Sequence, residues 1–177
     1  MQRRSAIRNL AVITGGILFL PSCKSTPGMA SIALKNIKID AAQENLLAEI
    51  ASIIIPATDT LGAKEVGAHL FALKMLDDLY EKEAQQDFLT GLEQLENGTK
   101  KQFDRSFIDC TIRQKQKVLL DIESKKGVPK ETADFYAIMK QRTVEGYLNS
   151  KYVMTKVIKY EFIPSKQYDG FYPVKNL

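Results

Sequence analysis

Few residues in this chain could carry chemistry. The 177 residues include one histidine, two cysteines and no tryptophan. The histidine, His69, is followed by Leu70 and Phe71, and a histidine in such a place could shuttle a proton or bind a metal ion. Because the sequence holds no second histidine and no CxxC spacing, we expect His69 either to be a structural residue that bonds the preceding loop or to contact a partner. We predict no catalytic, cofactor-binding or metal-binding residue in this chain.

The carboxylates are spaced as helix caps and surface groups are. Asp59 lies in the loop PATDTLGA and could bind a cation together with loop carbonyls, but an aspartate in such a loop more often caps the next helix or accepts from backbone amides. Asp77 and Asp78 are adjacent, so on a helix they point about 100° apart and cannot act as a catalytic pair. Together with Glu81 they are expected to form a solvated acidic face.

The N-terminal segment has the features of an export signal. Arg3, Arg4 and Arg8 precede an apolar run from Leu10 to Leu20, which is eleven residues long. Such a run is too short to cross about 30 Å of hydrocarbon as a helix, but it has the length of a signal-peptide core. The paired Arg3 and Arg4 resemble a twin-arginine signal, which exports folded proteins. A general secretion signal also begins with basic residues and is the alternative.

The segment ends in Leu-Pro-Ser-Cys, which is similar to a bacterial lipobox. We predict a twin-arginine-like lipoprotein signal over residues 1–23, cleaved before Cys23, with a lipid on that thiol. Two acyl chains give a stable anchor, whereas one chain binds only marginally. The protein is therefore expected at the periplasmic face of a bacterial membrane. Cys110 would remain as the single thiol, and we expect it to be buried and inert, with pairing to a partner as the alternative.

The net charge of +4 belongs mostly to this leader. Removing Arg3, Arg4 and Arg8 leaves 22 basic residues against 21 acidic ones, a formal charge of +1. Lysine clusters at 100–101, 115–117 and 125–126 are interleaved with acidic residues. We therefore expect these lysines to be solvated, and we predict no nucleic-acid partner.

Apolar periodicity predicts an all-α fold with about five helices. Asp40 is the expected N-cap of the first, with Gln43 as its capping-box partner, and Pro56 should follow its end. Asn97-Gly98 is expected to close the third helix as a C-cap pair. The predicted helices cover residues 41–55, 64–81, 83–96, 111–125 and 131–149. We expect one helical domain over 40–150, a tether over 24–39 before it, and an irregular aromatic arm over 151–177.

Six of the seven tyrosines lie near the C-terminus. Aromatic side chains of this kind are enriched at protein interfaces, because they bury a large area and still present a polar tip. The arm could equally pack back onto the helical domain, and both readings stay open. The candidate interface residues are His69, Tyr147, Tyr152, Tyr160, Tyr168 and Tyr172.

The most distinctive stretch is AEIASIIIPATDTLGAKEVGAHLFALKMLDDLY over residues 48–80. Together with QQDFLTGLEQL, MKQRTVEGYLNS and KYEFIPSKQYDG further along, it closely resembles the gluconate 2-dehydrogenase subunit 3 family. That family consists of small exported subunits of membrane-associated dehydrogenase complexes. The resemblance covers most of residues 40–170.

This resemblance implies an accessory subunit that acts in export, assembly and anchoring of a flavoprotein. The FAD would belong to a separate large subunit of the glucose-methanol-choline type, and haem c to a cytochrome subunit. The sequence agrees, since it has no GxGxxG turn for a dinucleotide and no CxxCH site for covalent haem. A stand-alone periplasmic lipoprotein of the same fold that binds another partner is the alternative.

Overall fold

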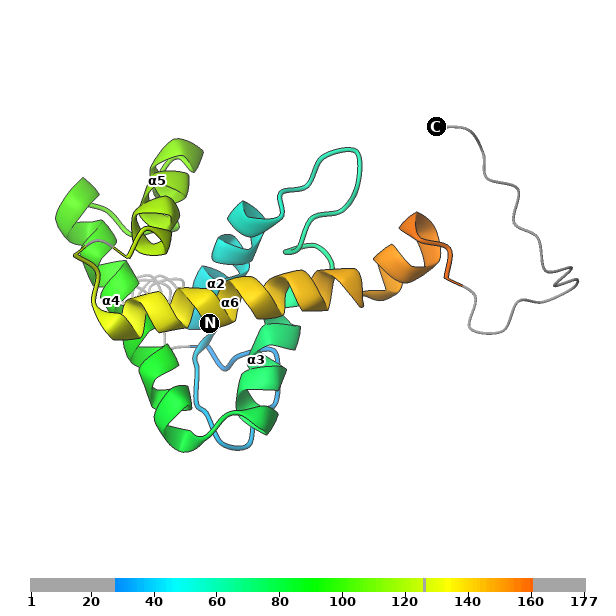
Figure 1. Ribbon diagram of the computed structural model, residues 1–177, viewed down its shortest axis with the longest axis horizontal. Coiled ribbons are helices and arrows are strands. Elements are labelled where there is room, and N and C mark those ends of the chain that lie inside the picture. Colours follow the sequence, from blue (N-terminus) through cyan, green and yellow to red (C-terminus); the bar gives the residue numbers. More distant parts are fainter. Residues whose placement is uncertain (1–27, 126, 161–177) are drawn as a thin grey trace, which may run out of the picture.

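The computed structural model of the protein describes residues 28–125 and 127–160. As predicted, the domain is all-α, and the described residues form no β-strand, only an isolated bridge between Met29 and Asp40. Figure 1 shows the arrangement of the helices. They are α2 (Ala41–Ile54), α3 (Ala68–Leu79), α4 (Lys82–Phe103), α5 (Ile112–Glu123), α6 (Lys130–Leu148) and the short π-helix η2 (Val153–Val157).

Helix α6 is the centre of the domain and packs most extensively against α4 and α3. In Figure 1 it crosses the domain horizontally, with α3 below it and α5 above it. Phe88 of α4 meets Phe135 of α6 edge to face, with ring centroids 4.7 Å apart, an arrangement that aromatic quadrupoles favour. The core around this pair is made of buried aliphatic side chains, among them Leu47, Ile50, Leu73, Leu76, Leu92 and Met139.

Two glycines let helices approach α6 closely. A methyl group at Gly91 would lie 2.5 Å from the Cβ atom of Phe135 and closer still to the backbone carbonyl oxygen of Glu131. A methyl group at Gly146 would lie 2.8–2.9 Å from the side chain of Phe71. The α4–α6 and α3–α6 crossings therefore each need a residue without a side chain at the contact.

The first helix begins as predicted. The Asp40 side chain accepts from the backbone N–H of Gln43 at 2.8 Å, and the Gln43 side chain accepts from the backbone N–H of Asp40 at 3.1 Å. This reciprocal capping box satisfies two donors that the first turn of a helix leaves free.

The start predicted for the second helix was wrong by four residues. Helix α3 begins at Ala68, because Gly67 has a left-handed backbone with φ of 72°, and Gly67 is its N-cap without any side-chain hydrogen bond. The expectation that Asp59 caps this helix was also wrong: Asp59 is exposed in the preceding loop. There the backbone N–H of Gly62 donates instead to the Glu65 carboxylate at 3.0 Å.

The predicted C-cap at Asn97-Gly98 was wrong as well. Helix α4 continues through both residues to Phe103 and ends at Asp104, which has a left-handed φ of 55°. The extra turns pack against the domain, since Thr99 is buried. Within the helix, the Thr99 hydroxyl donates to the carbonyl of Leu95 at 2.8 Å.

The predicted tether over 24–39 is packed in its described part. Residues 28–41, which we call the entry loop, close on themselves where the backbone N–H of Ala41 donates to the carbonyl of Gly28 at 2.8 Å. Ile37 in the middle of the loop is buried in the core. Residues 28–39 therefore pack as part of the folded domain, although they were predicted to be a tether.

Candidate partner interface

The predicted interface residues do not share one surface. His69 is only 8% exposed, and its Nδ1 atom is buried without a hydrogen-bond partner. Burial lowers the pKa of His69, so the ring is neutral at pH 7. His69 is therefore largely buried, its Nδ1 atom does not bond the preceding loop as expected, and a contact with a partner stays a prediction.

Tyr147, Tyr152 and Tyr160 lie at the C-terminal end of α6 and just after it. The Tyr147 hydroxyl donates to the backbone carbonyl of Leu61 at 3.1 Å and joins α6 to the loop after α2. Tyr152 is half-buried, and Tyr160 is 55% exposed. Tyr168 and Tyr172 lie outside the residues that the structure describes.

Exposed apolar side chains surround Tyr147. Val144 and Leu148 occupy the same stripe of α6 as Tyr147, at helical spacings of three and four residues, and are 37% and 50% exposed. Leu61, whose carbonyl Tyr147 binds, is 43% exposed. We call these four residues the end surface. Val157 and Ile158, which follow in and after η2, are also exposed.

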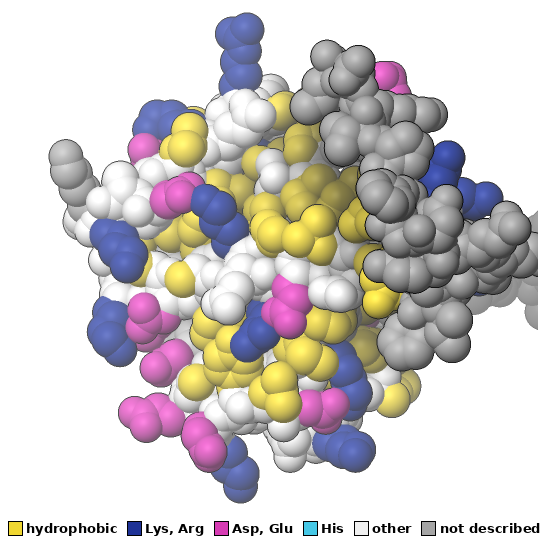
Figure 2. Space-filling model, turned by 45° about the vertical axis from the view of Figure 1, so that its right-hand side comes forward, with side chains coloured by type: hydrophobic (Ala, Val, Ile, Leu, Met, Phe, Trp, Pro, Cys, Tyr) yellow, Lys and Arg dark blue, Asp and Glu magenta, His cyan; other side chains and the backbone are white. Residues whose placement is uncertain are grey.

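Figure 2 shows a face of the molecule on which areas of hydrophobic side chains are interspersed with basic and acidic side chains, some of them near the middle. Val144 and Leu148 are among the apolar positions that predict a helix over residues 131–149. Periodicity alone could not reveal that they face solvent, because α6 has more apolar positions than its contacts with α3 and α4 cover.

Sequence reasoning also missed the most connected carboxylate in the domain. Asp77 was expected on a solvated face, but its side chain is fully buried and binds the entry loop. It accepts from the backbone N–H groups of Lys35 at 2.8 Å, Asn36 at 2.7 Å and Ile37 at 3.0 Å. Burial by itself raises the pKa of Asp77, but these three donors, with Lys74 nearby, outweigh it and hold the pKa below the ordinary value.

A second cluster, which is partly buried, joins three segments through Glu49 of α2. Its carboxylate accepts from Lys115 of α5 at 2.9 Å and also pairs with Lys64 of the loop before α3. Burial opposes ionisation of Glu49, but the two lysines outweigh it and lower its pKa. The expectation that Lys115 is solvated was therefore wrong: it is 7% exposed, and its ammonium lies 5.9 Å from the ring centroid of Phe107.

Cys110 is buried, as predicted, and it forms no disulfide with another described residue. Burial raises the pKa of its thiol, so little thiolate forms at neutral pH.

Within the described ranges, no three histidine, cysteine, aspartate or glutamate residues cluster closely enough to hold a metal ion. None of the described helices combines the length and the apolar character needed to cross a membrane.

The family model of gluconate 2-dehydrogenase subunit 3 matches residues 41–164, more than half of the chain. The chain belongs to this family. Membership implies a subunit of a multi-subunit dehydrogenase of the gluconate 2-dehydrogenase type. The matched range begins at the first residue of α2 and includes the whole end surface. Comparison with curated proteins and comparison with solved structures gave no match.

Proposed function

We propose that this chain is the non-catalytic small subunit of a membrane-associated, flavin-dependent sugar or alcohol dehydrogenase, and that it acts in export, assembly and anchoring of the flavoprotein subunit. The observation that carries the proposal is the family match over residues 41–164. In this proposal FAD belongs to a large subunit of the glucose-methanol-choline type and haem c to a cytochrome subunit, with no cofactor in this chain.

The end surface is the proposed contact with the flavoprotein. Tyr147 supplies an aromatic ring beside Val144 and Leu148, and interfaces draw most of their energy from such aromatic anchors within an apolar patch. Exposed aliphatic side chains grouped in this way lose contact with water when a partner covers them, and that burial stabilises the complex.

Co-expression with a candidate flavoprotein large subunit of the glucose-methanol-choline type tests the proposal. We expect the two proteins to purify together and Leu148→Glu to weaken the complex at least about tenfold, because a charge would be buried without a partner. Leu120→Glu is the matched control, since Leu120 is 64% exposed but lies on α5. Separate purification, or equal weakening by both variants, would overturn the proposed contact.

Export and anchoring have separate tests. If Arg3 and Arg4 form a twin-arginine signal, replacing both by lysine should leave the chain and its flavoprotein in the cytoplasm. Mass spectrometry of the mature N-terminus should find a diacylglyceryl group on Cys23. An unmodified Cys23 would contradict the proposed lipid anchor. A flavoprotein that reaches the periplasm without this chain would contradict the proposed role in export.

A further inference from the structure

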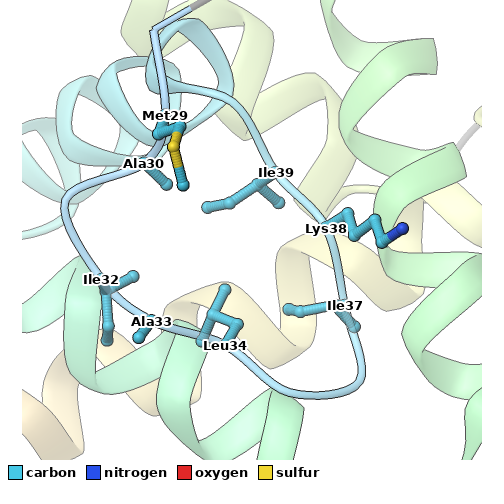
Figure 3. A pocket seen from close by; sticks show the side chains of 8 residues that line it. All are labelled: Met29, Ala30, Ile32, Ala33, Leu34, Ile37, Lys38 and Ile39. Atoms are coloured by element: carbon cyan, nitrogen blue, oxygen red, sulfur yellow. The ribbon is translucent and has the colours of Figure 1, made fainter.

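The entry loop encloses an apolar hollow with a volume of about 400 Å³. This volume lies in the range of ordinary ligand pockets, about 300–1,000 Å³. Figure 3 shows that a single turn of the chain forms its wall. The lining residues are Met29, Ala30, Ile32, Ala33, Leu34, Ile37, Lys38 and Ile39.

The hollow is held open by a bridge within the loop and by two contacts from α2 and α3. Its base is closed by the bridge between Met29 and Asp40. On one side, the Glu44 carboxylate accepts from the backbone N–H and the hydroxyl of Ser31, each at 2.6 Å. On the other side, Asp77 binds three successive N–H groups of the loop. A wall fixed in this way can receive an occupant without being reorganised, which lowers the entropic cost of binding.

The chemistry of the lining selects an apolar occupant. In Figure 3 the side chains of Met29, Leu34 and Ile39 are directed toward the middle of the ring, whereas the ammonium of Lys38 points away from it. Lys38 is the one charged residue of the lining, so no charge is placed to bind an ionic group inside. Met29 is 93% exposed at the rim, and burying such a side chain is favourable.

A segment of suitable chemistry enters the loop directly. The run from Leu10 to Leu20 contains no charged residue, and eight residues separate Leu20 from Met29. Eight extended residues span at most about 27 Å, which is enough for the run to turn back onto the hollow. Because both groups belong to one chain, their effective concentration is in the millimolar range, so even a weak contact is populated.

We propose that the hollow of the entry loop is a docking site for the chain's own apolar run, residues 10–20, before the leader is removed. The folded domain thus shelters the apolar part of its leader from water and from non-specific contacts. This inference goes beyond the proposed function, because docking within one chain requires neither a flavoprotein nor a lipid.

Disulfide trapping in the purified full-length chain tests the docking. In a Cys23→Ser background, Leu18→Cys is combined with Ala33→Cys, which lies in the hollow, or with the control Ala137→Cys, which is exposed on α6. The intrachain disulfide of the monomer is quantified by peptide mapping after mild oxidation. We expect the Ala33 pair to form at least about ten times faster than the Ala137 pair. Equal rates would overturn the proposal.

A charged residue placed in the leader provides a second test, which leaves the sequence of the folded domain unaltered. Ile17→Glu, added to the Leu18–Ala33 pair, should slow the trapping at least about tenfold, because a carboxylate would have to enter an apolar hollow. Asn9→Glu lies outside the run and should leave the rate unchanged. If Ile17→Glu has no effect, the hollow does not hold the run, whatever the outcome of the co-purification experiment.

Discussion

Asp77 shows how much of this domain depends on one side chain. Its neighbour Asp78 has the same charge and the same place in the sequence pattern, but it is exposed and pairs with Lys74 at 3.0 Å. The donors of Asp77 lie about forty residues earlier in the chain. No local pattern links such distant segments, which is why the sequence could not separate the buried carboxylate from the solvated one.

We expect Asp77→Asn to lower the free energy of unfolding by about 3 kcal/mol, because an amide offers one acceptor oxygen where the carboxylate offers two and leaves buried N–H groups unpaired. Urea unfolding at pH 7 measures this. Asp78→Asn is the matched control and should cost about 0.5 kcal/mol or less, as exposed ion pairs do. Similar losses in the two variants would contradict the role given to Asp77.

The difference in stability between the wild type and Asp77→Asn should depend on pH. The pKa of Asp77 is lower in the folded state than its ordinary value of 3.8, so as the pH falls the unfolded chain takes up this proton first. The stabilisation by Asp77 is therefore complete above about pH 5 and is lost as the pH falls through the folded pKa. The stability difference between the wild type and Asp77→Asn should shrink between pH 5 and the folded pKa, and a constant difference would refute this.

Cys110 should react slowly with a thiol reagent in the folded protein. It is 6% exposed and its pKa is raised by burial, so both access and thiolate content are low. With Cys23 replaced by serine, we expect release of the chromophore from a disulfide reagent to be at least about a hundred times slower than in urea. Rapid reaction of the folded chain would show that Cys110 is accessible, as an intermolecular disulfide would require.

At the scale of the elements, the sequence correctly predicted a helix cap that depends only on residues close together in the chain. The capping box of Asp40 and Gln43 involves residues three apart and was predicted correctly. Asn97-Gly98 has the composition of a helix end, but α4 continues through it because the contact of Thr99 with the domain favours further helix. Intrinsic preference is small compared with tertiary packing, so it decides the structure only where packing leaves a choice.

The two glycines of α4 should respond in opposite directions to alanine. Gly91→Ala should destabilise the domain by about 3 kcal/mol, because the backbone carbonyl of Glu131 and the Cβ atom of Phe135 leave no room for a methyl group. Gly98 has no atom within 4 Å of an added methyl group, so Gly98→Ala should stabilise by about 0.5–1 kcal/mol. Thermal unfolding measures both, and effects of the same sign would contradict the close α4–α6 crossing.

At the scale of the whole molecule, the entry loop is part of the domain. A chain that begins at Asp40 lacks the donors to Asp77 and the buried side chain of Ile37. We expect it to unfold at least about 10 °C below a chain that begins at Gly28. Calorimetry of the two chains measures the difference. Equal unfolding temperatures would mean that residues 28–39 contribute nothing to the folded state.

The sequence predicted the fold class, but it did not predict which side chains of the helices remain exposed. Helical periodicity was enough for five helices, because each has a continuous apolar face. That the C-terminal tyrosines mark a partner contact stays a prediction, and the exposure of Val144 and Leu148 depends on where the neighbouring helices stop. The hollow of the entry loop could not be predicted, because its residues show no periodicity and were assigned to a tether.

The early start of the folded domain also limits how the protein can sit on a membrane. If Cys23 carries the anchor, only four residues separate it from Gly28, whose carbonyl accepts from the backbone N–H of Ala41. That leash spans at most about 18 Å, which is less than the diameter of the domain. The domain would then stand with the entry loop and the start of α2 toward the lipid headgroups rather than tumble on a long tether, and the end of α6 would be presented to a partner in a restricted set of orientations.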